Sequence, residues 1–266
     1  MNGYSFSVSI NAGAVMGTVV LIILCLAGFA IVHILKMLRM YLIVMEKHIP
    51  IKKFIPVYLR TTFVNLIIPY KIGEVYRVGE FSRLLGGVFP GLFTVLTDRF
   101  FDTLALILIL LPYQALFGKG VSVSVAVLSV FLILLIFGYV IFPSSYRYLN
   151  RYIIMSRTSK RSMAALKGLE FVSEWYEYVK ELITGRYGLM MLFSFGAWIA
   201  EFLVLVGMSR IFGYRFSVSE FGEYISSIMS GSSTGLGQMY TAVGATIIAA
   251  AAIAATVVYL TGRNKE

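Results

Sequence analysis

Five charged residues occupy a short stretch of a chain that otherwise avoids charge. Lys71, Glu74, Arg77, Glu80 and Arg83 lie within residues 71–83, whereas charged residues make up only 14% of the 266-residue chain. The last four recur every three residues, so in a helix each acid has a base one turn away, and such pairs can neutralise one another. This spacing fits two interpretations equally well: a short interfacial helix with solvated ion pairs, or a charged lining for a polar ligand.

A second charged cluster, "TDRFFD", begins the next apolar run. Asp98 and Asp102 are four residues apart and share a helix face, with Arg99 beside them. The helix dipole favours an acid in a first turn, so Asp98 also has a purely structural interpretation. Asp102 lies deeper, and we expect it to pair with a base such as Arg77, Lys71 or Arg99.

One further acid, Glu201, interrupts the long apolar run at 187–210. Ionisable residues inside membrane segments are costly and therefore mark functional hypotheses. Arg210 is too far along the same helix to be its neighbour. We expect Glu201 either to find a partner on another segment or to be a protonated carboxyl in a hydrogen bond.

The composition indicates an integral membrane protein. Hydrophobic residues reach 59% and the mean hydropathy is +0.84. Charged residues make up 14% of the chain, about half of their usual share of roughly 25% in a soluble domain. The net charge of +10 does not indicate a nucleic-acid partner. Lys and Arg cluster between apolar segments, as in cytoplasmic loops and in contacts with anionic lipid headgroups.

Apolar runs predict an all-α polytopic bundle, one transmembrane domain over 1–266. A span needs about 20 apolar residues, and about five segments qualify: 13–35, 100–117, 121–142, 187–210 and 239–260. Basic residues follow the first, third and last of these. The positive-inside rule therefore predicts a multi-pass cell-membrane protein with its N-terminus outside and its C-terminus cytoplasmic.

Residues 54–98 are not predicted to form a regular transmembrane helix. The region is apolar but short, and it is interrupted by a series of prolines, glycines and polar residues: Pro56, Arg60, Asn65, Pro69, Gly86, Gly87, Pro90 and Gly91. We expect broken or re-entrant helices here, which protein or a water-filled cavity must cover. Pro69 and Gly73 mark the turn before a helix at 73–84.

Two other regions have a distinct character. Residues 144–186 predict a cytoplasmic loop that contains an amphipathic helix at 163–184, lying at the interface or packed on the bundle. Residues 217–235 are a second candidate for a broken or re-entrant segment. In "GSSTGLG" at 231–237, Gly235 and Gly237 predict a break that allows close packing or the approach of a substrate.

Signatures of enzymes and cofactors are sparse. The two histidines, His33 and His48, have no metal-ligand spacing with each other or with Cys25, the single cysteine. The chain contains no H-E-x-x-H, G-x-S-x-G or Walker sequence. We therefore expect no metal, no cofactor and no covalent catalysis.

The charged stretch resembles a known membrane family. "NLIIPYKIGEVYR" is similar to the pattern N-x-x-x-P-x-R-x-G-E-x-x-R, and "DRFFD" to E/D-R-x-x-D, of the flippase-like transmembrane domain of lysylphosphatidylglycerol synthases and their stand-alone bacterial and archaeal relatives. Lys71 replaces the usual Arg, which keeps the charge but loses the bidentate fork. Tyr240 or a neighbour stands where the family has a late acid, and Glu220 and Glu223 are the acids that could take its place.

The resemblance implies binding and transbilayer movement of a polar-headed lipid, either an aminoacylated phospholipid or a polyprenyl- or dolichyl-phosphate sugar. Lys71, Arg77 and Arg99 would hold the lipid phosphate. A central Arg77–Glu74 pair is expected, with further polar support from Asn65, Asp98, Asp102 and Glu201. The partners implied are the lipid and a lipid-modifying enzyme or glycosyltransferase, and a homo-oligomer stays open.

Two other functions remain open from the residues alone. The first is a membrane scaffold that regulates an envelope-lipid enzyme without transporting anything. In that case the charge cluster would serve only to stabilise the fold. The second is an intramembrane enzyme acting on a lipid phosphate, which the sparse histidines and the lack of a metal-ligand pattern disfavour.

Overall fold

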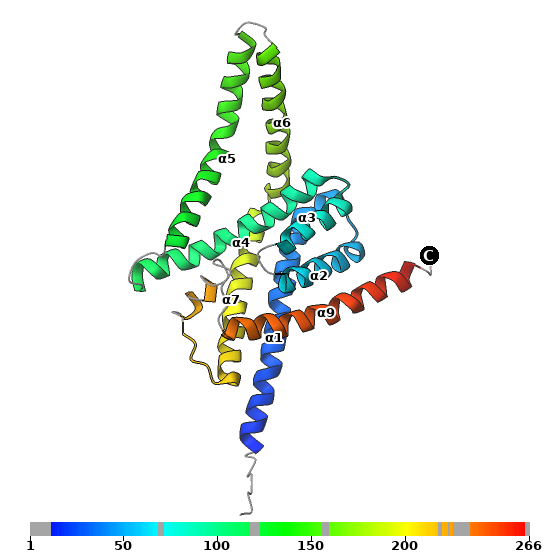
Figure 1. Ribbon diagram of the computed structural model, residues 1–266, viewed down its shortest axis with the longest axis vertical. Coiled ribbons are helices and arrows are strands. Elements are labelled where there is room, and N and C mark those ends of the chain that lie inside the picture. The colour runs from blue at the N-terminus through cyan, green and yellow to red at the C-terminus, as the bar shows by residue number, and fades with distance from the viewer. Residues whose placement is uncertain are drawn as a thin grey trace, which may run out of the picture.

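The computed structural model describes residues 12–68, 72–117, 123–155, 160–217, 220–222, 224–225 and 235–263, and these residues contain helices and no strand. The predicted all-α fold is confirmed. The helices are α1 (Ala12–Val44), α2 (Ile51–Ile67), α3 (Ile72–Leu85), α4 (Val88–Phe117), α5 (Val123–Met155), α6 (Lys160–Ile183), α7 (Tyr187–Phe212) and α9 (Gly235–Arg263), with a 3-10 turn at Met45–Lys47. Figure 1 shows their arrangement.

Within the described ranges, four helices are long and apolar enough to cross a membrane, namely α1, α5, α7 and α9. They match four of the five predicted spans. The remaining predicted span, 100–117, forms the C-terminal part of α4. The molecule is therefore a multi-pass helical membrane protein.

Helices α1 and α7 lie side by side through the centre of the molecule (Figure 1). Small residues let their backbones approach closely, as is common in membrane bundles. A Cβ added at Gly207 would lie 2.5 Å from Cys25 Sγ, and one added at Gly28 would lie 2.7 Å from Val204 Cγ2. This pair is the frame on which the other helices pack.

Helix α1 is longer than the sequence predicts. The apolar run suggests an end near residue 35, but the helix continues to Val44. Lys36 and Arg39, which the sequence places in a basic cytoplasmic segment, are therefore helical residues, and Arg39 is buried. Acids from distant helices neutralise both bases within the bundle, Glu201 for Lys36 and Asp98 for Arg39.

Helices α2 and α3 form a hairpin beside α1, and α9 packs on α2 (Figure 1). The predicted helix at 73–84 is confirmed as α3. Its start lies close to α2, because a Cβ at Gly73 would come within 2.6 Å of Asn65 Cα. Only glycine fits there without separating the two helices.

The break between α3 and α4 is narrower than predicted. Gly86 ends α3 with a φ of +75°, and the Gly87 N–H donates to the Ser82 carbonyl at 3.0 Å, as in a Schellman cap. Pro90 and Gly91 do not interrupt the helix, contrary to prediction, because α4 runs through both of them. Pro90 lies in the first turn of α4, where no helical partner for its missing N–H is required.

Helices α5 and α6 form the long hairpin at the top of Figure 1. The amphipathic helix predicted at 163–184 is α6, and it packs on the bundle through aromatic rings. Trp175 stacks on Phe93 of α4 with ring centroids 5.0 Å apart, and Tyr176 contacts Tyr139 of α5 at the same distance. Residues 144–155, predicted as part of a loop, continue α5 as helix.

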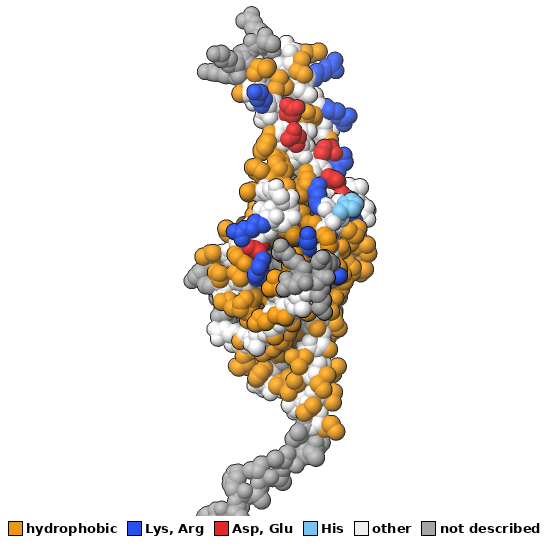
Figure 2. All heavy atoms as spheres, turned by 90° about the vertical axis from the view of Figure 1, so that its right-hand side faces the viewer, with side chains coloured by type: hydrophobic (Ala, Val, Ile, Leu, Met, Phe, Trp, Pro, Cys, Tyr) orange, Lys and Arg blue, Asp and Glu red, His pale blue; other side chains and the backbone are white. Residues whose placement is uncertain are grey.

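Charge is unevenly distributed over the surface. In the face shown by Figure 2, charged side chains lie in the upper half, while the lower part is hydrophobic or uncharged. The lower end is where α1 begins in Figure 1.

Candidate functional site

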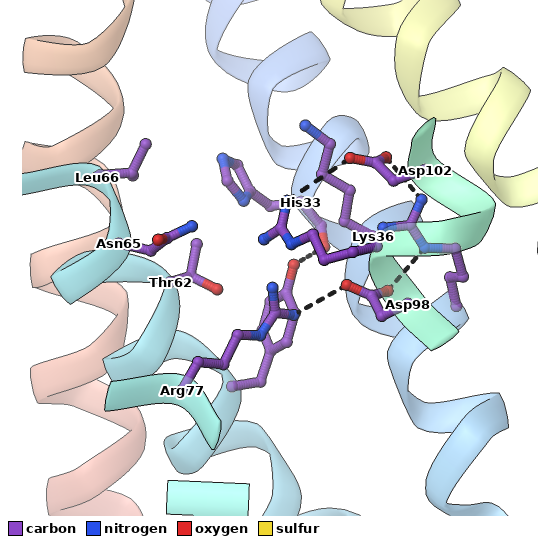
Figure 3. Close-up of a pocket in the computed structure, with 11 residues that line it drawn as sticks. His33, Lys36, Thr62, Asn65, Leu66, Arg77, Asp98 and Asp102 are labelled. Atoms are coloured by element: carbon purple, nitrogen blue, oxygen red, sulfur yellow. Dashed lines mark hydrogen bonds and ion pairs between the residues drawn. The ribbon is translucent and has the colours of Figure 1, made fainter. Parts of the chain in front are cut away.

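A polar cavity of about 110 Å³ lies among α1, α2, α3 and α4 (Figure 3). On α1 it lies between two apolar clusters, of which one includes Phe29 and the other Met40. Its walls carry several charged and hydrogen-bonding side chains. The lining residues are His33, Lys36, Arg39, Tyr58, Thr62, Asn65, Leu66, Arg77, Asp98, Arg99 and Asp102.

Arg39 forms the innermost part of the charged network. Its Nε donates to Asp98 Oδ1 at 2.8 Å, and its Nη1 donates to Asp102 Oδ1 at 2.7 Å and to Ser194 Oγ at 2.9 Å. The Arg39 and Asp98 side chains are only 2% and 1% exposed. A buried ion pair persists only with such complete hydrogen bonding, so this part of the site is a fixed support.

Arg77 is less completely bonded than Arg39. Its Nη2 lies 3.4 Å from Asp98 Oδ2, and its guanidinium lies over the Tyr58 ring at 5.8 Å. The Arg77 Nε is buried and has no hydrogen-bond partner among the described residues. Figure 3 shows the side chain reaching across the cavity from α3 toward Asp98. Arg77 therefore has a buried donor that no described residue satisfies.

The outer part of the network joins three helices. Arg99 Nη2 lies 2.6 Å from Glu74 Oε1, and the same oxygen accepts a hydrogen bond from Asn65 Nδ2 at 2.8 Å. Within the described part of the chain, Arg99 Nε and Glu74 Oε2 are buried without a partner. The side chains of Arg99 and Glu74 are 38% and 21% exposed, so this pair lies nearer the surface than Arg39 and Asp98.

Lys36 links the cavity to a separate acid. Its Nζ donates to Glu201 Oε2 of α7 at 2.7 Å, and it lies over the Trp198 ring at 5.4 Å. Glu201 Oε1 accepts a hydrogen bond from the Tyr224 hydroxyl at 3.0 Å. Glu201 therefore has a partner on another segment, which is one of the two alternatives expected from the sequence. The sequence did not identify Lys36 as that partner.

The structure brings together most of the predicted site residues. Asn65, Arg77, Asp98, Arg99 and Asp102 line the cavity, while Glu74 and Glu201 bind residues that line it. Lys71 and Pro69 lie outside the described residues. Of the predicted breaks, Gly73 lies against Asn65 and Gly235 is the first residue of α9, whereas Gly237 lies within α9, its carbonyl accepting from Thr241 at 2.9 Å.

The expected pairing within α3 is only partly correct. Glu80 pairs with Arg83 one turn away at 2.8 Å, and it also pairs with Arg60 of α2. The expected central pair of Arg77 with Glu74 is wrong, because these residues pair across helices with Asp98 and Arg99. The ion-pair partners of both Arg77 and Glu74 lie on α4.

Six residues that line the cavity were not predicted from the sequence: His33, Lys36, Arg39, Tyr58, Thr62 and Leu66. The first three recur at helical spacing along α1, which is the one signal that could have joined them. His33 Nδ1 is buried without a hydrogen-bond partner in the described structure. The cavity is thus lined by more bases than the charged stretch of α3 suggests.

Glu220, one of the acids that could replace the late family acid, serves a local role. Its carboxylate accepts a hydrogen bond from the Ser217 backbone N–H at 2.7 Å. Hydrogen bonds from Ser217 hold the pKa of Glu220 below its usual value. Glu223 lies outside the described residues. Tyr240, at the late position, is buried against Phe29 with ring centroids 5.6 Å apart.

The lining favours an anion over a metal ion. Three of the four bases in the wall are arginines, and arginine presents a planar fork that matches a phosphate. No group of three or more potential metal ligands occurs among the residues that the structure describes. The arrangement offers arginine donors of the kind that bind phosphate groups.

Comparisons with known proteins agree with the motifs in α2, α3 and α4. Residues 8–258 match the family model described as the lysylphosphatidylglycerol synthase transmembrane region. Neither the curated proteins nor the solved structures include a match to the chain. Since the family model covers nearly the whole chain, the protein belongs to the family of the lysylphosphatidylglycerol synthase transmembrane region.

Proposed function

We propose that the protein binds the phosphate of a polar-headed lipid in this cavity and moves the lipid, chemically unchanged, between the leaflets. The observation that carries the proposal is the wall of four bases and two acids, in which Arg77 and Arg99 each retain a buried Nε without a partner in the described structure. Buried donors of this kind are costly unless a ligand satisfies them. A phosphate oxygen is the natural acceptor for both.

The cavity size limits what enters it. At about 110 Å³ it is well below the 300–1,000 Å³ of typical small-molecule pockets. A phosphate fits, whereas the rest of an aminoacylated phospholipid or a polyprenyl- or dolichyl-phosphate sugar would need the helices to separate. We infer that the helices separate when a lipid enters.

The α2–α3 hairpin is the element best suited to open. With 17 and 14 residues, these helices are about 26 and 21 Å long at 1.5 Å per residue, which is shorter than the hydrocarbon core of about 30 Å. We infer that the hairpin dips into the bilayer and returns, as expected from the sequence. The partly exposed Arg99–Glu74 pair lies on the side from which a headgroup would approach.

Orientation follows from the basic residues. We assign the N-terminus to the outer side of a cell membrane and the C-terminus to the cytoplasm, which requires α4 to cross the membrane in addition to the four apolar helices. Lys52 and Lys53 after α1, and Arg147 and Arg151 in the distal part of α5, support this assignment because they are exposed, as cytoplasmic bases usually are.

Lipid retention tests the binding proposal. The purified protein should retain a phosphate-bearing membrane lipid that native mass spectrometry detects. The substitution Arg77→Gln should lower that retention, whereas Arg83→Gln should not, because Arg83 is 82% exposed on the same helix. Equal retention by wild type and both variants would contradict binding at this cavity.

A scaffold role remains a second candidate because of the α5–α6 hairpin. Helix α5 has 33 residues, about 50 Å, and so extends beyond a hydrocarbon core of about 30 Å. Its distal part exposes large side chains, including Tyr148, Tyr152 and Met155, where a lipid-modifying enzyme, a glycosyltransferase or a second copy could dock. A scaffold alone would move no lipid in vesicles that contain only the purified protein.

A further inference from the structure

The charged network around the cavity is electrically balanced. Ion pairs within the described residues connect four bases with four acids: Lys36, Arg39, Arg77 and Arg99 with Glu74, Asp98, Asp102 and Glu201. An anionic phosphate that enters this set brings a negative charge without a matching positive one. Unmatched charge in a buried site is expensive, so binding requires a compensating change.

A single proton on one of the four acids would restore the balance, and the contacts indicate which acid receives it. Asp98 has Arg39 and Arg77 as partners, and Asp102 has Arg39 and Arg99. Glu74 has Arg99 and the Asn65 amide. Each of these three carboxylates is held by arginine.

Glu201 is held differently. Its basic partner is Lys36, at 2.7 Å, and its other oxygen accepts from the neutral Tyr224 hydroxyl. Lys36 has a flexible stem with a compact ammonium, lines the cavity and is 24% exposed, whereas Glu201 is 4% exposed. Lys36 is therefore the base most able to turn toward a phosphate, and Glu201 is the acid that would then lose its counter-charge.

We propose that the protein carries an anionic lipid phosphate together with one proton: Lys36 turns from Glu201 to the phosphate, and Glu201 takes up the proton. This rests on the proposed function and deepens it, because it specifies a headgroup with one net negative charge. Zwitterionic headgroups bring their own positive charge and would require no proton.

The step is balanced in charge. Before binding, the pair consists of the Lys36 ammonium and the Glu201 carboxylate. After binding, the ammonium keeps its protons and faces the phosphate, and Glu201 is a neutral carboxylic acid beside the Tyr224 hydroxyl. The proton comes from water on the side from which the lipid arrives, and it is released when the lipid leaves and Lys36 returns.

The ionisable neighbours of Glu201 in the described part of the chain are compatible with this exchange. Lys36 approaches it from α1, Tyr224 from the 224–225 segment, and Tyr240 from α9. The Asp102 carboxylate of α4 also attracts the Lys36 ammonium. The tyrosine hydroxyls are neutral and can donate to a carboxylate or accept from a carboxylic acid.

Calorimetry with short-chain lipids tests the proposal on the wild-type protein. Dihexanoyl-phosphatidylglycerol is the anionic probe and dihexanoyl-phosphatidylcholine is the zwitterionic one. Titrations in two buffers with different ionisation enthalpies should show uptake of about one proton per anionic lipid, and the affinity should rise up to about tenfold per unit fall in pH. The zwitterionic lipid should take up none.

Two matched variants identify the proton site. Glu201→Gln mimics the protonated acid, so it should bind the anionic lipid with an affinity independent of pH and without proton uptake. Glu177→Gln should behave like the wild type, because Glu177 forms an exposed pair with Lys180 at 2.8 Å on α6. Proton uptake that persists in Glu201→Gln would overturn the assignment.

The outcomes separate this inference from the proposed function. A wild-type protein that binds the anionic lipid without proton uptake refutes the proton step and leaves the cavity site intact, even if Glu201→Gln does not fold. A wild-type protein that binds neither lipid refutes the proposed function itself.

Discussion

Arg39 of α1 donates from Nε to Asp98 Oδ1 of α4 at 2.8 Å, and both side chains are almost completely buried. The pair joins residues 59 positions apart and fixes α4 against α1. Arg77 approaches the second oxygen of the same carboxylate. A rigid inner pair therefore supports the more loosely bonded arginine that faces the cavity.

Loss of Arg39 should strongly destabilise the fold. Removal of one partner from a buried ion pair leaves an uncompensated charge, at a cost of about 3–5 kcal/mol. Arg39→Gln should therefore unfold at much lower denaturant concentration in detergent. Arg147→Gln is the control, since Arg147 is exposed on α5. Equal stability of the two variants would show that Arg39 is not part of a buried support.

The contact between α2 and α3 should depend on one glycine. A Cβ at Gly73 would lie 2.6 Å from Asn65 Cα, a backbone atom that cannot rotate away. Gly73→Ala should thus cost about 1–3 kcal/mol, as overpacking usually does. Gly79→Ala on the same helix meets nothing within 4 Å and should be neutral or stabilising. Thermal unfolding of the two variants compares them directly, and equal melting temperatures would contradict the close approach.

Lys36 and Glu201 should be energetically coupled. Lys36→Met leaves the Glu201 charge buried without its base, so this variant should be less stable than the double variant Lys36→Met with Glu201→Gln. A double-mutant cycle in detergent should give a coupling of about 1–3 kcal/mol. The same cycle on the exposed Lys180–Glu177 pair should give no measurable coupling. A coupling near zero for both pairs would remove the basis for the proton step.

The sequence predicted the class of fold well because long apolar runs are a local signal. The span expected at 187–210 appears as α7, Tyr187–Phe212. The site was partly predictable as well, because Arg77, Asp98, Arg99 and Asp102 stand out against apolar neighbours. Their pairing was not predictable, since it depends on how α3 faces α4.

Lys36 and Arg39 show where local reasoning fails. A base that follows an apolar run looks like the start of a cytoplasmic loop. Here the neutralising acids come from α4 and α7, and Glu201 lies 165 positions from Lys36. Only the packing of α1 against these helices reveals that the bases are inside. Pro90 was misleading for a related reason, because proline breaks a helix interior but is tolerated in a first turn.

A headgroup-accessibility assay tests most directly whether the cavity moves a lipid headgroup. Vesicles that contain only the purified protein and a fluorescent phospholipid are treated with a membrane-impermeant quencher. In vesicles with the wild-type protein, fluorescent lipid from the inner leaflet should reach the outer leaflet and lose its fluorescence to the quencher. Arg77→Gln should be about tenfold to hundredfold slower, because a hydrogen bond to a charged group contributes about 1.5–3 kcal/mol. Arg83→Gln should match wild type. Transport by Arg77→Gln at the wild-type rate would contradict the claim.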